Sequence, residues 1–401
     1  MKKTTYVAMN VYWFGIAFLW NSLHPIVLPA LLLAFVPESR KNSYLGGLTF
    51  AGLVLAMIVQ PLAGALSDRS RCRWGRRRPW MLAGTASSLL FLSLIPLAES
   101  FWSLLAIYLA LQLASNVAHG PAQGLIPDLL PEERRGLGAG IKNLFDMLGL
   151  IAASVVAGRL IEGGQKALAV AVIGGGVAIS AATTLLATPE PPTSAAAASP
   201  RTPLFQVDLR RFPNYTRLIV SRFFILVGIY AVQGFAQYFI RDRLAVPNPA
   251  EVTGSLMAVI GLALTAIVFP AGFLSDRLGR RSLNLGGGGL AALGIFLLVF
   301  ARSVAALYVF AAVIGLAAGI FVSTNWAWAT DLIPPQEAGK YLGFSNLATA
   351  GAGAASRLAG PLIDAVNNLR PGDYLGYPLL FLLASASAVL GTLLLLRVDE
   401  Q

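Results

Sequence analysis

The stretches GALSDR at residues 64–69 and GRRRP at 75–79 have a second copy later in the chain, as GFLSDR at 272–277 and GRR at 279–281. Each copy lies between two long apolar segments, and the first copy is the longer one. A short basic loop that recurs at matching places in two halves of an apolar chain indicates a duplicated membrane protein whose halves move.

The composition agrees with this interpretation. Of the 401 residues, 56% are hydrophobic and 12% are charged, and the mean hydropathy is +0.69, whereas soluble domains carry about 25% charged residues. A membrane-spanning helix needs roughly 20 apolar residues. The segments are too long and too uniformly apolar for the alternating strands of a barrel. Twelve stretches qualify, at residues 5–34, 44–66, 80–98, 101–127, 137–160, 166–187, 214–240, 251–274, 282–300, 302–330, 338–366 and 374–396.

The repeat extends beyond the basic loops. DLLP at 128–131 is followed by Gly136, Gly140 and Asn143, and DLIP at 331–334 is followed by glycines and an asparagine at the same spacing. A Pro/Ala/Ser-rich stretch divides the spans into six and six, and such composition is typical of a linker. We therefore expect an all-α membrane fold of two six-helix bundles related by a pseudo-two-fold axis, residues 1–188 and 214–401, joined by a cytoplasmic linker at 189–213.

The net charge of +11 is explained by the distribution of Lys and Arg between the two sides of the membrane. With the N-terminus in the cytoplasm, 19 of the 30 Lys and Arg residues fall on the cytoplasmic side and 8 on the other, which fits the positive-inside rule. We expect both termini in the cytoplasm, location in the inner membrane and no nucleic-acid partner. The single cysteine, Cys72, allows no intrachain disulfide, and the long first apolar stretch is not typical of a cleaved signal.

Polar residues within the predicted spans fall on single helical faces. Since polar groups in hydrocarbon are costly, each stripe faces a cavity or a partner. Amides both donate and accept hydrogen bonds, and aromatic rings stack on sugars, so we expect a cavity for a neutral, hydroxyl-rich ligand; the alternative is that the amides join helices. The stripes are Asn10, Trp13, Asn21 and His24 in the first span, Gln112, Asn116, His119 and Gln123 in the fourth, and Arg222, Tyr230, Gln233 and Gln237 in the seventh. The tenth span offers Asn325, Trp326 and Trp328.

Charged residues inside the spans form two further candidate groups. Lys142 and Asp146 are four residues apart and can pair on one helical face, either as a proton-coupling carboxylate with its partner or as a static ion pair. Arg357 and Asp364 are seven residues apart, which predicts one face of the eleventh span, where they contact substrate, gate the outer side or form a structural pair. The sequence shows no catalytic constellation, and we expect no metal and no cofactor.

The basic loops combine carboxylates at helix ends with nearby arginines. A carboxylate in this position can bind a neighbouring helix N-terminus and pair with arginine, so that breaking the contact would be part of opening. We therefore expect a gating role for six residues, with simple topological retention as the alternative. These are Asp68, Arg69, Arg76, Asp276, Arg277 and Arg280.

These loops resemble the helix 2–3 signature of the major facilitator superfamily. VQPLAG at 59–64, SDR at 67–69 and RWGRRRPW at 73–80, with Gly120-Pro121 and Asp128-Leu129, resemble the sucrose–proton symporters and the wider glycoside–pentoside–hexuronide cation symporters. The resemblance implies twelve helices, with helices 1, 4, 7 and 10 around a midplane substrate site. It also implies alternating access and no enzymatic activity.

The sequence departs from these relatives at coupling positions. Ala56 and Gln60 stand where sodium-coupled members carry acids, which argues against sodium. Gln112 replaces the helix 4 aspartate of the sucrose group, and Gln123 replaces an arginine of that group. Asp146 would therefore have to bind the proton, or the protein is uncoupled.

Together these features predict a monomeric secondary transporter for a sugar or glycoside, driven by protons. A proton-driven exporter of drugs or amphipathic metabolites is the main alternative, since the tryptophans would suit apolar cargo. A non-transporting receptor or an accessory factor in membrane pigment assembly is a third possibility, and a membrane enzyme is the weakest.

Overall fold

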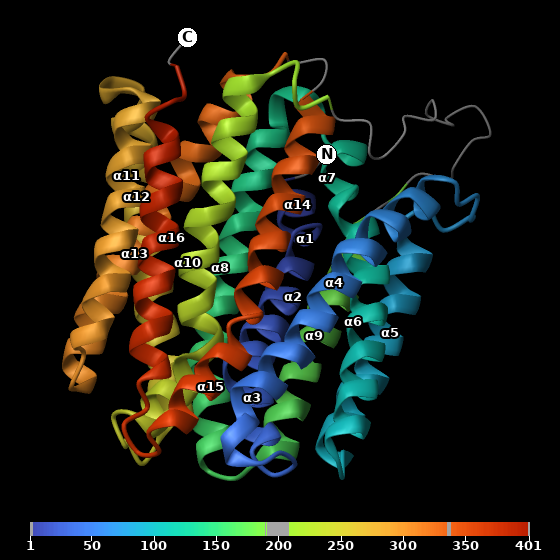
Figure 1. The fold of residues 1–401 in the computed structure, drawn as a ribbon. Helices are drawn as coiled ribbons and strands as arrows, with labels where there is room; N and C mark the ends of the chain where they lie inside the picture. Colours follow the sequence, from blue (N-terminus) through green and yellow to red (C-terminus); the bar gives the residue numbers. More distant parts are fainter. Residues whose placement is uncertain (1–2, 189, 191–207, 335–337, 400–401) are drawn as a thin grey trace. The chain divides into compact units, whose positions relative to one another are not determined.

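The computed structural model describes residues 3–188, 190, 208–334 and 338–399, and within these ranges all regular elements are helices. The chain divides into two compact units (Figure 1). Residues 1–36 and 51–201 form unit 1, and residues 37–50 and 202–401 form unit 2. Most of the linker expected at 189–213 lies outside the described residues, although one helix ends at Ala187 and the next begins at Pro213.

Unit 1 follows the first half of the chain. Its first predicted span is interrupted, because a turn at Met9–Asn10 and a π-helical turn at Leu23–Val27 divide it into three α-helices. The helices of this unit are α1 (Lys3–Ala8), α2 (Val11–Ser22), α3 (Leu28–Leu32), the greater part of α4 (Lys41–Asp68), α5 (Arg78–Leu94), α6 (Phe101–Gln123), α7 (Leu125–Leu129), α8 (Glu132–Glu162) and α9 (Lys166–Ala187).

Unit 2 follows the second half and also includes the beginning of α4. The segment Pro37–Phe50 groups with it, whereas the remainder of α4 groups with unit 1. The division into bundles at 1–188 and 214–401 therefore stays a prediction. The remaining helices of unit 2 are α10 (Pro213–Asp242), α11 (Pro249–Leu278), α12 (Arg280–Leu297), α13 (Val304–Asp331), α14 (Ala338–Arg357), α15 (Gly360–Leu369) and α16 (Gly376–Leu395).

Equivalent helices pack together in the two units. In unit 1, α2 packs against α8 and α9, and α5 packs against α6. In unit 2, α10 packs against α14 and α16, and α12 packs against α13. The first helix of each half thus contacts the fifth and sixth, and the third contacts the fourth. The duplication expected from the sequence is present in the packing.

In the described part of the chain, eleven helices are long and apolar enough to span a membrane. The remaining predicted span, 338–366, is divided into α14 and α15, with a break at Leu358–Ala359. Pro361 lacks an N–H group and is suited to the first turn of a new helix. Gly360 lies so close to α4 that a Cβ there would be 2.2 Å from the carbonyl oxygen of Asn42. The expectation of one helical face carrying Arg357 and Asp364 is therefore wrong.

Each unit has its own aromatic-rich core. In unit 1, Tyr12 and Trp13 of α2 pack with Met81 of α5 and with Ala118 of α6. In unit 2, the corresponding cluster includes Tyr215, Phe321, Trp328 and Tyr341. These cores fix the first helix of each half, α2 and α10, which carry the polar stripes.

Candidate functional site

The polar stripe of the first span lies along an irregular helix. Asn10 is buried at the turn between α1 and α2, where its Nδ2 donates to the carbonyl of Tyr6 at 2.9 Å. Asn21 donates to its own helix, at the carbonyl of Ala17. His24 lies in the π-helical turn that contains Pro25. Such turns redirect side chains and are frequent at functional sites.

His24 meets the stripe of α6 through a chain of hydrogen bonds. Asn116 Nδ2 donates to Gln112 Oε1 at 3.1 Å, and Gln112 Nε2 donates to the Tyr108 hydroxyl at 2.9 Å. The Tyr108 hydroxyl lies 3.0 Å from His24 Nε2. Because Tyr108 already accepts from Gln112, its own proton is available to His24. His24 Nε2 accepts this proton in the tautomer that carries its own proton on Nδ1.

This N-terminal polar chain, defined as His24, Tyr108, Gln112 and Asn116, is the clearest polar cluster of unit 1. Its amides and hydroxyl are uncharged, and Trp20 stacks on His24 with ring centroids 5.0 Å apart. The structure therefore brings together three of the predicted residues. Tyr108 was missed, although it lies one turn before Gln112 and continues the same spacing.

A second cluster of unit 1 surrounds Lys142 on α8. Its Nζ lies 2.7 Å from Asp146 Oδ2 and 4.1 Å from the ring centroid of Trp13. His119 of α6 makes an edge contact with Trp13 at 5.1 Å. Both charged side chains are about one quarter exposed, at 26% and 25%. The predicted ion pair thus forms, and its lysine lies against the ring of Trp13.

In unit 2, Arg222 of α10 connects to two other helices. Its Nη1 donates to Asn325 Oδ1 on α13 at 3.0 Å, and its Nε donates to Thr349 Oγ1 on α14 at 3.0 Å. The ring of Trp326 lies 5.7 Å from the guanidinium. We name these four residues the Arg222 cluster. Thr349 had not been predicted.

The other predicted residues of unit 2 are placed differently. Trp328 is 2% exposed and packs in the hydrophobic core, because it lies on the buried face of α13. Gln237 is also buried, whereas Tyr230 and Gln233 are partly exposed. Arg357 is the last residue of α14 and lies against Gly234 of α10. A Cβ added at Gly234 would be 1.5 Å from Nη1 of Arg357.

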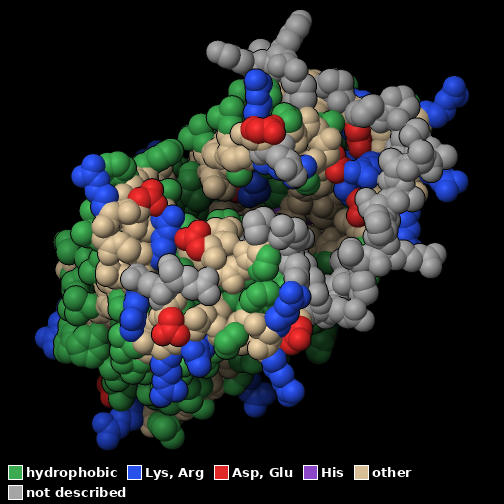
Figure 2. All heavy atoms as spheres, turned by 90° about the horizontal axis from the view of Figure 1, so that it is seen from above, with side chains coloured by type: hydrophobic (Ala, Val, Ile, Leu, Met, Phe, Trp, Pro, Cys, Tyr) green, Lys and Arg blue, Asp and Glu red, His purple; other side chains and the backbone are tan. Residues whose placement is uncertain are grey.

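The two basic loops build the same ion-pair group in each unit. In unit 1, Arg77 contacts Asp68, and its Nε lies 2.9 Å from Asp128 Oδ2. In unit 2, Arg280 Nη1 lies 2.7 Å from Asp276, and its Nε lies 3.1 Å from Asp331. We call these the loop triads. Figure 2 shows one face of the molecule, on which Lys and Arg side chains lie beside Asp and Glu side chains.

The counterpart of Arg280 is therefore Arg77 and not Arg76, which the matching Gly-Arg-Arg stretches had suggested. Arg76 still pairs with Asp128. Burial lowers the pKa of Arg76, but the hydrogen bond and charge of Asp128 outweigh this and raise the pKa above its usual value. Arg76 consequently stays charged at any physiological pH. Arg277 lies over Phe273 at 4.4 Å.

Glu190 adds a contact that the sequence did not indicate. Its carboxylate accepts from the backbone N–H groups of Arg76 and Arg77, both at 2.9 Å to Oε1, and from that of Arg78 at 3.2 Å. These groups begin α5, so Glu190 satisfies free donors at a helix N-terminus and complements its dipole.

Asp364 performs a similar role at the beginning of α4. Its carboxylate accepts from the backbone N–H and the hydroxyl of Ser43, each at 2.6 Å, and from Asn42 Nδ2 at 2.8 Å. Nearby, Lys41 pairs with Asp242 at 2.7 Å, and the Tyr377 hydroxyl donates to the same carboxylate at 2.5 Å. We call these six residues the α4-start network. Of them, only Asp364 had been predicted.

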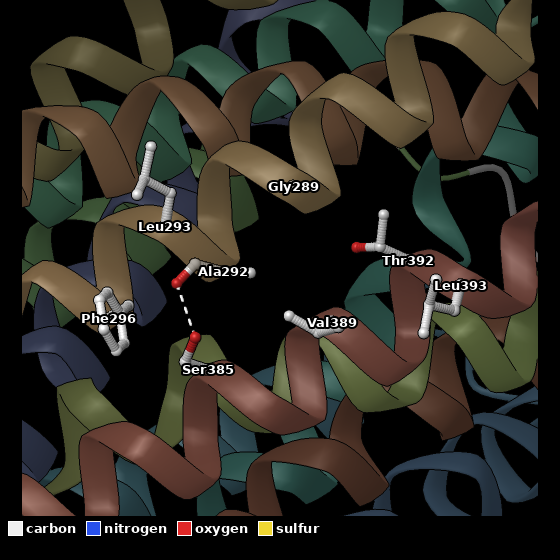
Figure 3. A pocket seen from close by; sticks show the side chains of 8 residues that line it. All are labelled: Gly289, Ala292, Leu293, Phe296, Ser385, Val389, Thr392 and Leu393. Atoms are coloured by element: carbon white, nitrogen blue, oxygen red, sulfur yellow. Dashed lines mark hydrogen bonds between the residues drawn. The ribbon is translucent and has the colours of Figure 1, made fainter.

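An apolar groove of about 440 Å³ lies between α12 and α16 (Figure 3). Ser385 and Thr392 are its only hydroxyl residues, and Ser385 Oγ donates to the carbonyl of Ala292 at 2.8 Å. The groove carries no titratable group and is separate from the polar clusters. No group of His, Cys, Asp and Glu in the described ranges is arranged to hold a metal ion.

The fold and its repeated packing define an all-helical, multi-pass membrane protein built from two equivalent halves. The family model of the Major Facilitator Superfamily matches residues 5–356, and a further match covers 218–401. The chain belongs to this superfamily, and the family and its similar proteins are transporters and not enzymes.

Among similar proteins, lactose permease of Lactobacillus helveticus is 24% identical over 284 residues, which cover 64% of this chain and 44% of the permease. Proton-associated sugar transporter A of Homo sapiens is 38% identical over 82 residues, which cover 20% of this chain and 10% of that protein. The matches thus span less than half the length of both relatives. The crystal structure of a bacterial homologue of the human lysosomal transporter Spinster superposes with a TM-score of 0.77 at 16% identity, covering 98% of this chain and 96% of that one.

Proposed function

We propose that this protein is a secondary transporter that carries a sugar or a glycoside by alternating access and couples its movement to protons. The observation that carries the proposal is the N-terminal polar chain. It presents amide, hydroxyl and imidazole groups in a fixed order beside the ring of Trp20. Neutral donors and acceptors next to an aromatic face suit sugar hydroxyls and the apolar face of a sugar ring.

The relatives favour the same substrate class. One is named a lactose permease, and another is named a proton-associated sugar transporter. Ala56 and Gln60 provide no carboxylate for sodium, so the proton is the coupling ion that we propose. We propose that the protein is a monomer in the inner membrane. Both of its termini would then lie in the cytoplasm.

For coupling we propose Asp146 together with Lys142. Asp146 is a partly buried acid of unit 1, and its partner is only 2.7 Å away. Lys142 also contacts the ring of Trp13. A ligand that binds against Trp13 would therefore disturb the ion pair and so change the proton affinity of Asp146.

For gating we propose the loop triad of each unit and, in unit 2, the α4-start network. In unit 1 the triad joins the end of α4, the residue before α5, and α7, and in unit 2 it joins α11, the start of α12 and the end of α13. The α4-start network holds the beginning of a helix whose remainder belongs to unit 1. Opening on either side would require one of these sets of contacts to break.

Reconstitution tests the proposal directly. Proteoliposomes containing the purified protein should accumulate labelled lactose, sucrose or melibiose when a proton gradient is imposed, with sugar-induced proton movement reported by a pH-sensitive dye. Absence of both sugar transport and sugar-induced proton flux would contradict the proposal. Transport of amphipathic cations in the same vesicles would support the drug exporter instead.

A further inference from the structure

Arg222 is a buried charge well inside the membrane-spanning part of α10. The helix begins at Pro213, and nine residues of helical rise place Arg222 about 14 Å from that end. The residue is 5% exposed. A cation at this depth is costly, so it normally has a carboxylate partner or faces a polar cavity.

The contacts of Arg222 are with neutral groups. Its guanidinium donates hydrogen bonds to Thr349 and Asn325, and its ring contact is with Trp326. Within the described ranges, no Asp or Glu forms an ion pair with it. Lys142 and Arg280, in contrast, each have a carboxylate within 3.1 Å. Arg222 is therefore a buried cation without a counter-charge in the described structure.

The residues around Arg222 have a hydrogen-bond donor left over for a ligand, and no acceptor. Thr349 donates its own proton to the carbonyl of Ser345 at 3.1 Å, so its oxygen can accept from Arg222. Asn325 must present Oδ1 to Arg222, and this orientation leaves Nδ2 without a partner, although the residue is 0% exposed. A buried, unpartnered N–H donor beside an unneutralised guanidinium is the arrangement that an anionic oxygen group would complete.

We infer that the Arg222 cluster binds an acidic group of the substrate, a carboxylate or a phosphate, through the Arg222 guanidinium and Asn325 Nδ2. The inference rests on the proposed function, and it narrows the substrate to a sugar that carries an acidic group. The ligand would supply the negative charge that the described part of unit 2 does not place beside Arg222. The competing explanation is that Arg222 only joins α10, α13 and α14, in which case ligand charge would have no effect.

Matched ligands separate charge from shape. Binding of glucuronate and of glucuronamide to the purified full chain is measured by thermal shift and calorimetry. Glucose 6-phosphate and glucose form a second pair that distinguishes phosphate from carboxylate. A charge-assisted contact predicts about 10- to 100-fold tighter binding of the acid in at least one pair.

Variants then assign the preference to the cluster. Arg222→Gln should equalise the acid and its neutral partner, and Arg222→Lys should retain part of the preference, because it keeps the charge and loses the planar fork. Asn325→Asp supplies an internal counter-charge and should also remove the preference. It covers the case in which Arg222→Gln fails to fold. Arg217→Gln, at an exposed arginine of the same helix, is the matched control and should keep the preference.

The outcomes distinguish this inference from the proposed function. Equal binding of acid and neutral ligand by the native protein overturns it, and so does a preference that survives both Arg222→Gln and Asn325→Asp. Counterflow in proteoliposomes tests transport separately. Flux of neutral sugars without any acid preference would leave the transporter proposal standing alone. An Arg222-dependent acid preference without flux of any sugar would support the binding site and contradict sugar transport.

Discussion

The polar faces of the two halves differ in charge, although the halves share one packing scheme. In unit 1, the N-terminal polar chain is neutral, and Lys142 has a carboxylate partner. In unit 2, the Arg222 cluster contains a buried cation whose hydrogen-bond partners, Thr349 and Asn325, are neutral. The two halves therefore offer different chemistry to a ligand.

The loop triads show the opposite relation. Asp68, Arg77 and Asp128 in one half correspond to Asp276, Arg280 and Asp331 in the other, with the same partners. The duplicated framework thus keeps the contacts that hold helix ends together, whereas the faces that would meet a substrate have diverged. This separates residues that serve the motion from residues that serve recognition.

The largest effect is expected at the ion pair of Lys142 and Asp146 in unit 1. Asp146→Asn should abolish proton-driven accumulation of sugar and leave exchange intact, because asparagine resembles the protonated acid and cannot release a proton. The measurement compares gradient-driven uptake with counterflow in the same proteoliposomes. Glu99→Gln removes an exposed carboxylate and serves as the control. Unchanged accumulation by Asp146→Asn would show that the ion pair is structural.

The two loop triads should differ in strength even though they share partners. The Arg77 side chain is 6% exposed and that of Arg280 is 28% exposed, beside an Asp276 that is 63% exposed. Arg77→Gln should destabilise the protein by about 3 kcal/mol, since it breaks a buried pair. Arg280→Gln should cost about 1 kcal/mol or less, because solvent screens the exposed pair.

Thermal unfolding of both arginine variants in detergent tests this order. Arg302→Gln changes an exposed arginine outside the triads and should leave the unfolding temperature unchanged. Equal losses for the two triad variants would show that the halves are held equally, and the difference in burial would then have no energetic consequence.

The sequence predicted the fold well because its signals are local or periodic. Long apolar segments and the constant shift between DLLP and DLIP required no knowledge of side-chain contacts. The stripes of α2 and α6 were also found, since residues four apart share a helical face. The π-helical turn at Pro25 and the break before Gly360 were not predicted, because they depend on close packing against a neighbouring helix.

Long-range contacts account for most of the site residues that were missed. Glu190 and Lys41 act on partners far away in the chain, at the beginning of α5 and on Asp242. Arg77 was not among the predicted gating residues, because its partner Asp128 lies 51 residues away in the chain. Trp328 was assigned to the cavity because it lies in the tenth span, and the structure packs it in the core.

The close contact at Gly360 offers a test of how the beginning of α4 is held. Gly360→Ala would place a Cβ 2.2 Å from the Asn42 carbonyl oxygen, and such overpacking typically costs about 1 to 3 kcal/mol. It should also disturb the nearby contacts of Asp364. Gly286→Ala, where a Cβ would have no neighbour within 4 Å, is the matched control. Equal unfolding temperatures for the two variants would contradict this packing.

The smallest expected effect is at the hydroxyl that links α6 to His24. Tyr108→Phe removes one acceptor for Gln112 and one donor for His24. It keeps the aromatic ring, whose centroid lies 6.5 Å from the ring centroid of Trp20. Loss of two neutral hydrogen bonds predicts roughly tenfold weaker binding of a neutral sugar. The acid preference assigned to Arg222 should stay, because the two clusters recognise different groups. If Tyr108→Phe removed the acid preference and left neutral sugar binding unchanged, the division of recognition between the two halves would be wrong.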